Sequence, residues 1–219
     1  MESVKEKIID ATEKMVRQKL EGEGTGHDWW HIHRVRNLAL HLAHTEGGCN
    51  LEIVELAALL HDIDDWKFNG GDEKAGGKIA KQWLISIATD FTVITQVCDI
   101  IDHVSYKGSG VPTLMRTIEG MIVQDADRLD ALGAIGIARA FAYGGSKSRE
   151  FYNPEIPPQI HISFEAYKKN GGTTINHFYE KLLLLKDRMQ TTSGRKIAEQ
   201  RHEYMKKFLE QFYTEWNAH

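Results

Sequence analysis

Cysteine, proline and long apolar runs are all scarce in this chain of 219 residues. The two cysteines, Cys49 and Cys98, form no Cys-x-x-Cys motif, which argues against a disulfide framework or a cysteine metal site. Only four prolines occur, so long helices can form over most of the chain. No apolar run reaches the roughly 18 residues of a membrane span, and the charged N-terminal stretch lacks a signal-peptide core. We therefore expect a cytoplasmic protein with no membrane partner.

An excess of positive charge is also missing. The 27 basic residues face 31 acidic ones, giving a net charge of −4, and no basic strip interleaved with aromatic residues occurs. Nucleic acid and anionic membranes would therefore not be attracted by the chain as a whole, and nucleic acid is not an expected partner. Hydrophobic residues make up 42% of the chain, a share typical of a globular protein with a sizeable core.

Helical periodicity runs through nearly the whole sequence. Apolar residues recur at steps of three and four, and no stretch alternates as a strand would, which predicts an all-α fold. Between residues 144 and 175 glycine, proline and charge predict an irregular segment, either a functional lid or a mobile loop. Pro112 suits the first turn of a helix. The expected helices span about residues 2–20, 28–46, 51–62, 72–89, 91–105, 112–143, 176–190 and 195–216.

Two histidines and one carboxylate occupy positions expected to be buried. His61 and Asp62 directly follow an apolar run, and a buried carboxylate is costly unless it is paired or bound to a cation. His31 shares a helix face with apolar residues, whereas His33 falls on a mostly polar face and is expected at the surface. A core histidine hydrogen-bonded to an adjacent aspartate is the structural alternative for each of these residues.

The predicted helix 112–143 adds further carboxylates. Asp127 shares its face with small apolar residues, namely Val123, Ala131, Ala134 and Ala138. It is therefore expected to be buried and either paired or bound to a cation. Asp125 groups with Arg128 and Arg139, so a salt-bridged face explains it. Asp130, three residues after Asp127, either supports a metal ligand from behind or is exposed, and exposure is favoured.

The inward residues form one mixed set of nitrogen and oxygen ligands: His31, His61, Asp62 and Asp127. Such a set suits manganese, iron, zinc, nickel or cobalt better than calcium, which prefers oxygen alone. It also leaves one or two positions for water or a substrate oxygen. A metal ion there would lower the pKa of bound water and neutralise charge on a phosphoryl group.

The order of these residues resembles the HD-domain metal-dependent phosphohydrolase superfamily. The matching pieces are His31-x-x-Arg34-Val35, Leu60-His61-Asp62-Ile63 and Ala126-Asp127-Arg128-Leu129. Similarity continues through residues 176–183 and 201–205, as in the small stand-alone bacterial HD hydrolases. The resemblance implies that His31, His61, Asp62 and Asp127 bind the metal. It also implies a single HD-domain helical bundle over residues 1–219, with a core of about 20–145 on which the loop 144–175 and the helices 176–216 pack.

The activity that the resemblance implies is metal-dependent hydrolysis of a nucleotide or another small phosphorylated metabolite, as a nucleoside triphosphate pyrophosphohydrolase or a phosphatase. Two-metal relatives use extra histidines between the His-Asp pair and the last aspartate, where this chain has only His103. We therefore expect one divalent ion, manganese first, with magnesium, iron, cobalt, nickel or zinc as alternatives. A non-catalytic HD ligand sensor and a di-iron HD oxygenase are the competing functions, and a homodimer is left open.

Further residues are candidates for catalysis and phosphate binding. Asp65, one helical turn beyond the His-Asp pair, is a candidate to orient or deprotonate the attacking water, or it caps a turn. Arg34 is a candidate for both roles. Because charge clamping usually dominates phosphoryl transfer, we expect phosphate contacts from a set of basic side chains. They are Arg34, Lys67, His103, Lys107 and Arg128.

Overall fold

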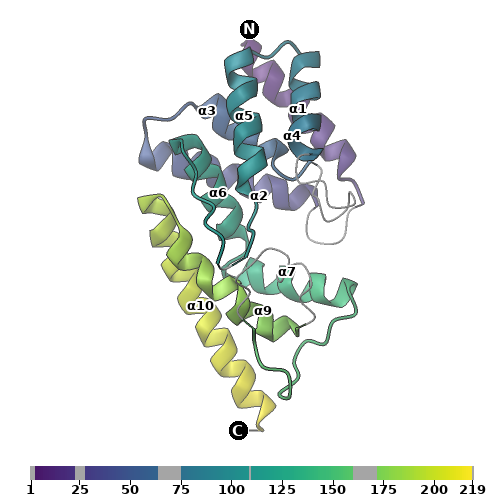
Figure 1. Cartoon of the computed structure of the whole chain (residues 1–219), viewed down its shortest axis with the longest axis vertical. Coiled ribbons are helices and arrows are strands. Elements are labelled where there is room, and N and C mark those ends of the chain that lie inside the picture. The colour runs from purple at the N-terminus through teal and green to yellow at the C-terminus, as the bar shows by residue number, and fades with distance from the viewer. Residues whose placement is uncertain (1–2, 23–27, 64–74, 109, 160–171, 219) are drawn as a thin grey trace. The chain divides into compact units, whose positions relative to one another are not determined.

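The structure is a computed structural model that describes residues 3–22, 28–63, 75–108, 110–159 and 172–218. Every regular element among these residues is helical, which confirms the all-α prediction (Figure 1). None of the described helices combines the length and apolarity needed to cross a bilayer. The α-helices are α1 (Val4–Lys19), α2 (Trp29–Glu46), α3 (Leu51–Leu60), α4 (Ala75–Ser86), α5 (Phe91–Val104), α6 (Ile118–Asp130), α7 (Gly133–Ser146), α9 (Thr174–Glu180) and α10 (Thr192–Trp216), and the 3₁₀ helix is η1 (Leu182–Arg188).

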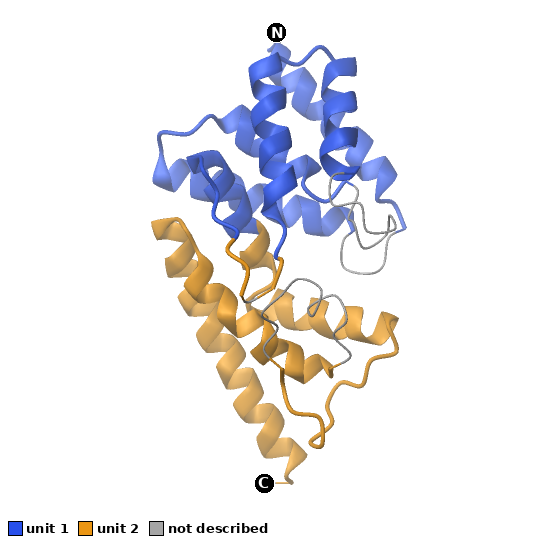
Figure 2. Ribbon diagram, viewed as in Figure 1, with its two compact units in different colours: residues 1–106, 113–126 blue, residues 107–112, 127–219 orange. Residues whose placement is uncertain are grey.

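The chain forms two compact units, each with its own packing (Figure 2). Unit 1 comprises Met1–Tyr106 and Thr113–Ala126, and unit 2 comprises Lys107–Pro112 and Asp127–His219. The boundary falls inside α6, between Ala126 of unit 1 and Asp127 of unit 2.

Unit 1 is built around α3. Seven of its ten residues are buried, and α1, α2 and α5 all pack against it. Arg36 of α2 ties three of these helices together, because its guanidinium lies 2.7 Å from a Glu13 oxygen on α1 and its Nε donates to Glu55 on α3 at 2.8 Å. The half-buried thiols Cys49 and Cys98 also lie in this unit, and burial raises the pKa of each. Because α3 is firmly packed, it fixes the position of His61, which directly follows its last residue.

Three helices of unit 1, α2, α3 and α5, begin where the sequence predicts. Asp28 caps α2, Asn50 caps α3 and Asp90 caps α5, each by accepting a hydrogen bond from a backbone N–H in the first turn. Two such donors, Thr92 and Val93, hold the pKa of Asp90 below its usual value. Val4, the first residue of α1, is 73% exposed and lies outside the buried face of that helix.

The predicted single helix 112–143 is wrong, because the chain turns within it. Pro112 precedes α6 by several residues, and a corner at residues 131–132 separates α6 from α7. Gly133 opens α7 with a φ of 73°, a left-handed value that disfavours any side chain with a Cβ. Ala134 and Ala138 therefore lie on α7, are exposed, and do not share a face with Asp127.

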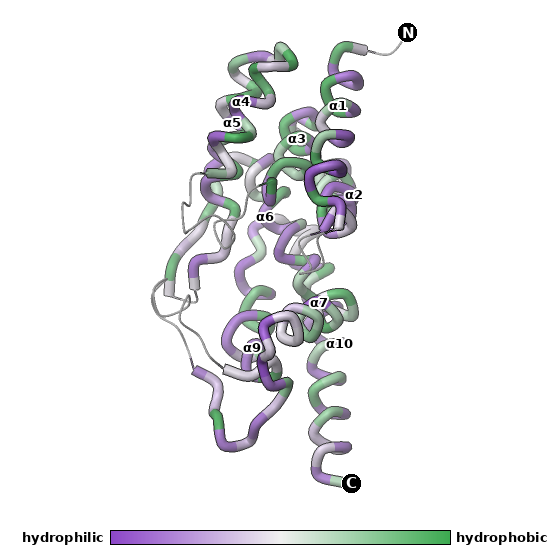
Figure 3. Tube along the Cα trace, turned by 90° about the vertical axis from the view of Figure 1, so that its right-hand side faces the viewer, coloured by the Kyte–Doolittle hydropathy of each residue, from purple (hydrophilic) through white to green (hydrophobic). Residues whose placement is uncertain are grey.

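Unit 2 packs α10 against α7 and η1, with α9 beside η1. The residues expected inward in the predicted helix 176–190 are buried, but Lys181 breaks that helix into α9 and η1. Apolar and polar positions alternate around α10 (Figure 3). Its buried face contains Met205, which is fully buried, but not the neighbouring Tyr204, which is 54% exposed.

The corner before α7 generates a stability prediction. Gly133→Ala should lower the free energy of unfolding by about 1–3 kcal/mol, because alanine is strained at positive φ and its Cβ would lie 3.1 Å from the Arg201 side chain. Gly145→Ala, in the same helix with nothing within 4 Å of the added Cβ, is the matched control and should be neutral or slightly stabilising. Urea denaturation followed by circular dichroism measures both, and equal midpoints would contradict the prediction.

Candidate metal centre

His31 and His61 reach the candidate site from two different helices. His31 lies in the first turn of α2, where its backbone N–H donates to the Asp28 carboxylate at 2.8 Å, and its side chain is fully buried. His61 follows the last residue of α3, and its Nδ1 lies 2.9 Å from the Ala58 carbonyl oxygen. Because a carbonyl can only accept, Nδ1 carries the proton and Nε2 presents a lone pair.

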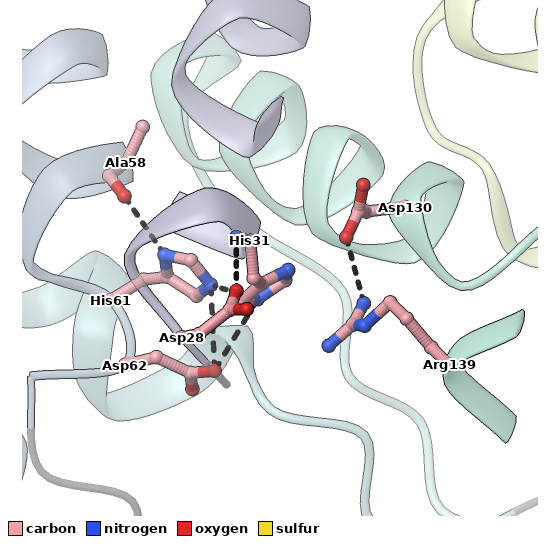
Figure 4. A network of polar contacts seen from close by, with 7 residues as sticks. All are labelled: Asp28, His31, Ala58, His61, Asp62, Asp130 and Arg139. Atoms are coloured by element: carbon pink, nitrogen blue, oxygen red, sulfur yellow. Dashed lines mark hydrogen bonds and ion pairs between the residues drawn. The ribbon is translucent and has the colours of Figure 1, made fainter. Parts of the chain in front are cut away.

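The ring nitrogens and a carboxylate converge at one point (Figure 4). The Nε2 atoms of His31 and His61 lie 3.2 Å apart, with the two rings inclined by 68°. Oδ2 of Asp62 is 3.4 Å from Nε2 of His31 and 3.8 Å from Nε2 of His61. All three side chains thus turn a potential ligand atom toward the same small volume.

Asp127 of α6 completes the group. His31, His61 and Asp127 each offer one ligand atom, and these three atoms lie within 4.8 Å of one another. Asp127 is half-buried, whereas both histidines are buried. Residues that stand far apart in the sequence are therefore gathered as the prediction of a metal site requires.

The donor set fits a divalent metal ion. An ion with bonds of roughly 2.0–2.2 Å to nitrogen and oxygen spaces neighbouring ligands by about 3.0–3.4 Å in octahedral or tetrahedral geometry. The separations of 3.2 and 3.4 Å around His31 fall in this range. A cation placed between these ligands would accept electron pairs from both imidazole nitrogens and from the carboxylates.

Comparison with known proteins assigns a family. The sequence model of the HD domain family matches residues 29–132. The chain is 38% identical to the uncharacterised protein YpgQ of Bacillus subtilis over 197 residues, which cover 90% of this chain and 87% of that protein. The chain belongs to the HD domain family. HD domains bind a divalent metal, and His31, His61 and Asp127 are suited to hold it here.

Solved structures agree with this assignment. A Lactobacillus plantarum protein superposes with a TM-score of 0.86 at 38% identity, covering 98% of both chains. An HD-superfamily hydrolase from Bacillus thuringiensis has a TM-score of 0.75 at 45% identity, covering 98% of this chain and 100% of its own. YpgQ in complex with ADP has a TM-score of 0.76 at 34% identity, covering 97% of each chain.

Two aspartates near the HD-domain ligands differ from expectation. Asp130 was predicted to be exposed but is 1% exposed, and it accepts a hydrogen bond from Arg139 at 2.8 Å (Figure 4). The corner after α6 makes this ion pair possible, because it brings α7 back toward the end of α6. Asp125 is fully buried, and the face expected to join it with Arg139 does not exist across that corner.

The phosphate-binding candidates occupy different surroundings. Arg34 and Lys107 are half-buried, and the His103 side chain is 57% exposed with Nδ1 2.7 Å from the Asp99 carbonyl oxygen. Arg128 is 4% exposed and donates to the backbone carbonyl of Arg188, so its guanidinium is engaged within unit 2. Asp65 and Lys67 lie outside the described residues.

The hydrogen bond between His61 and the Ala58 carbonyl was not predicted from the sequence. Outer partners of this kind orient a histidine ligand and raise its basicity. The sequence could have indicated this bond, because His61 directly follows a buried helix. The carbonyl groups in the last turn of a helix have no partner within the helix and can accept from a nearby side chain.

Metal content tests the centre directly. His31→Asn should lower the bound divalent metal at least tenfold, because it removes a buried imidazole that faces both His61 and Asp62. His41→Asn changes an exposed histidine of the same helix and should leave the metal content unchanged. Elemental analysis of dialysed protein measures both, and equal metal content in the two variants would contradict the assignment of His31.

Proposed function

We propose that this HD domain is a metal-dependent phosphohydrolase acting on nucleotides, as a nucleoside triphosphate pyrophosphohydrolase or a phosphatase. The observation that carries the proposal is the convergence of ligand atoms from His31, His61, Asp62 and Asp127. Two relatives support it, since one is described as an HD-superfamily hydrolase and the other, YpgQ, was crystallised with ADP.

A divalent ion held by these residues would supply a Lewis acid that lowers the pKa of water and neutralises charge on a phosphoryl group. Four protein ligands leave room for water and a phosphate oxygen. We propose a single ion, manganese first, because His103 is mostly exposed and its Nδ1 is bonded to a backbone carbonyl. The mixed nitrogen and oxygen set also accommodates magnesium, iron, cobalt, nickel or zinc.

The chain itself would position and stabilise the reacting groups. His61 is oriented by the Ala58 carbonyl, so its Nε2 keeps one direction. Arg34 lies one helical turn after His31 at the half-buried edge of α2, where its guanidinium would hold phosphate oxygens bidentately. We propose Asp65 as the residue that orients the attacking water, and Lys67, Lys107 and His103 as further phosphate contacts.

A hydrolysis panel tests this function. Wild type and Asp62→Ala would be assayed with nucleoside triphosphates, diphosphates and small phosphate esters in Mn²⁺, Mg²⁺, Co²⁺ or Ni²⁺, and phosphate would be separated from pyrophosphate. Activity should fall at least about 100-fold in Asp62→Ala, because its carboxylate faces both histidines. Asp10→Ala, which removes an exposed carboxylate from α1, is the matched control and should retain activity.

Other results would contradict the proposal. If the wild-type protein holds a metal but hydrolyses none of the compounds, the hydrolase function is wrong and the ligand-sensor function is favoured. If metal analysis finds two ions per chain, the single-metal centre is wrong and the di-iron oxygenase is favoured.

A further inference from the structure

Two consecutive tryptophans on α2 have opposite surroundings. Trp29 is 6% exposed, and the Arg17 guanidinium lies 5.8 Å from its ring centroid, so its role is to pack α2 against α1. Trp30, directly before the ligand His31, is 57% exposed. A large aromatic side chain left in water contributes little to the stability of the fold, so packing does not explain Trp30.

The exposed indole is held in place. The His33 ring lies 5.8 Å from the Trp30 ring at 83°, and it also contacts Trp29 at 6.0 Å. A nitrogen of His33 is in turn hydrogen-bonded to Asn37 at 3.0 Å. His33, expected at the surface, is thus half-buried as the support of Trp30. An aromatic side chain has only two side-chain torsions, so it loses little conformational entropy when a ligand stacks on it.

Helical geometry places Trp30 on the same side of α2 as Arg34, next to the ligand His31 in the chain. At about 100° per residue, Arg34 lies roughly 60° and Trp30 roughly 100° from His31, both in the same direction around α2. Trp30 and Arg34, four residues apart, are neighbours on the helix surface. A metal ligand, a guanidinium and an aromatic ring therefore follow one another around α2. A nucleotide presents the matching groups, with phosphates at one end and an aromatic base at the other.

We propose that Trp30 binds the nucleobase by stacking and so distinguishes nucleotides from other phosphate compounds. This inference rests on the proposed function, because it assigns the base-binding part of the same site. Stacking of a base on an aromatic residue corresponds to about a 5- to 100-fold gain in affinity. Phosphate and metal contacts contribute separately, so loss of Trp30 affects only ligands that carry a base.

Equilibrium binding separates this inference from the chemistry. Calorimetric titration of metal-loaded protein with ADP and with pyrophosphate compares two ligands with the same phosphate chain. Trp30→Leu, which keeps an apolar side chain without a ring face, should weaken ADP binding about 5- to 100-fold and leave pyrophosphate binding unchanged. Trp30→Phe should retain most of the ADP affinity. Trp216→Ala, at a 45% exposed tryptophan of α10, is the control and should bind both ligands as wild type does.

Three outcomes would overturn the role of Trp30. They are unchanged ADP affinity in Trp30→Leu, equal weakening of ADP and pyrophosphate, and no ADP binding by wild type. If the hydrolysis panel alone fails, the role of Trp30 still stands, because ADP binding that requires an aromatic side chain at position 30 would support a base-binding site.

Discussion

The rest of the site depends on an electrostatic constraint: electron pairs of two histidines and two aspartates are directed at one point in largely buried surroundings. Gathering polar and charged groups in buried surroundings costs free energy, so the helices that carry them must be held firmly by other interactions. The apolar α3 provides this support for His61 and Asp62, and Arg36 links α3 to α1 and α2 through ion pairs. The hydrophobic core of unit 1 is therefore what makes a ligand cluster possible.

The starts of α2, α3 and α5 were predictable because they are decided locally. Asp28, Asn50 and Asp90 cap helices by bonding to backbone N–H groups two or three residues away, an interaction written in the sequence itself. The corner after α6 was not predictable, because its alanines, glycines and leucines keep the same periodicity whether a helix continues or turns. Distant residues decide it: Arg201 of α10 donates to the Leu129 carbonyl and lies against Gly133.

The same distinction separates the predicted and the missed parts of the site. His31 could be found because a polar residue on an apolar helix face is visible in the local sequence, and His61 because it directly follows an apolar run. Asp127 was found although Ala134 and Ala138, half of the face assigned to it, lie on α7. The burial of Asp130 could not, because its partner Arg139 comes within reach only through the corner between α6 and α7. Contacts made across a turn depend on tertiary structure, and helical periodicity carries no information about them.

The burial of α3 also bears on how the protein acquires its metal. In zinc fingers, binding of the ion and folding of the chain are one event, because no core exists without the metal. Here seven of the ten residues of α3 are buried by apolar packing that involves no ion. We therefore expect the core of unit 1 to form before the ion binds, and the bound ion to add stability to a chain that is already folded. Selection among divalent ions would then follow metal supply and their intrinsic affinity order.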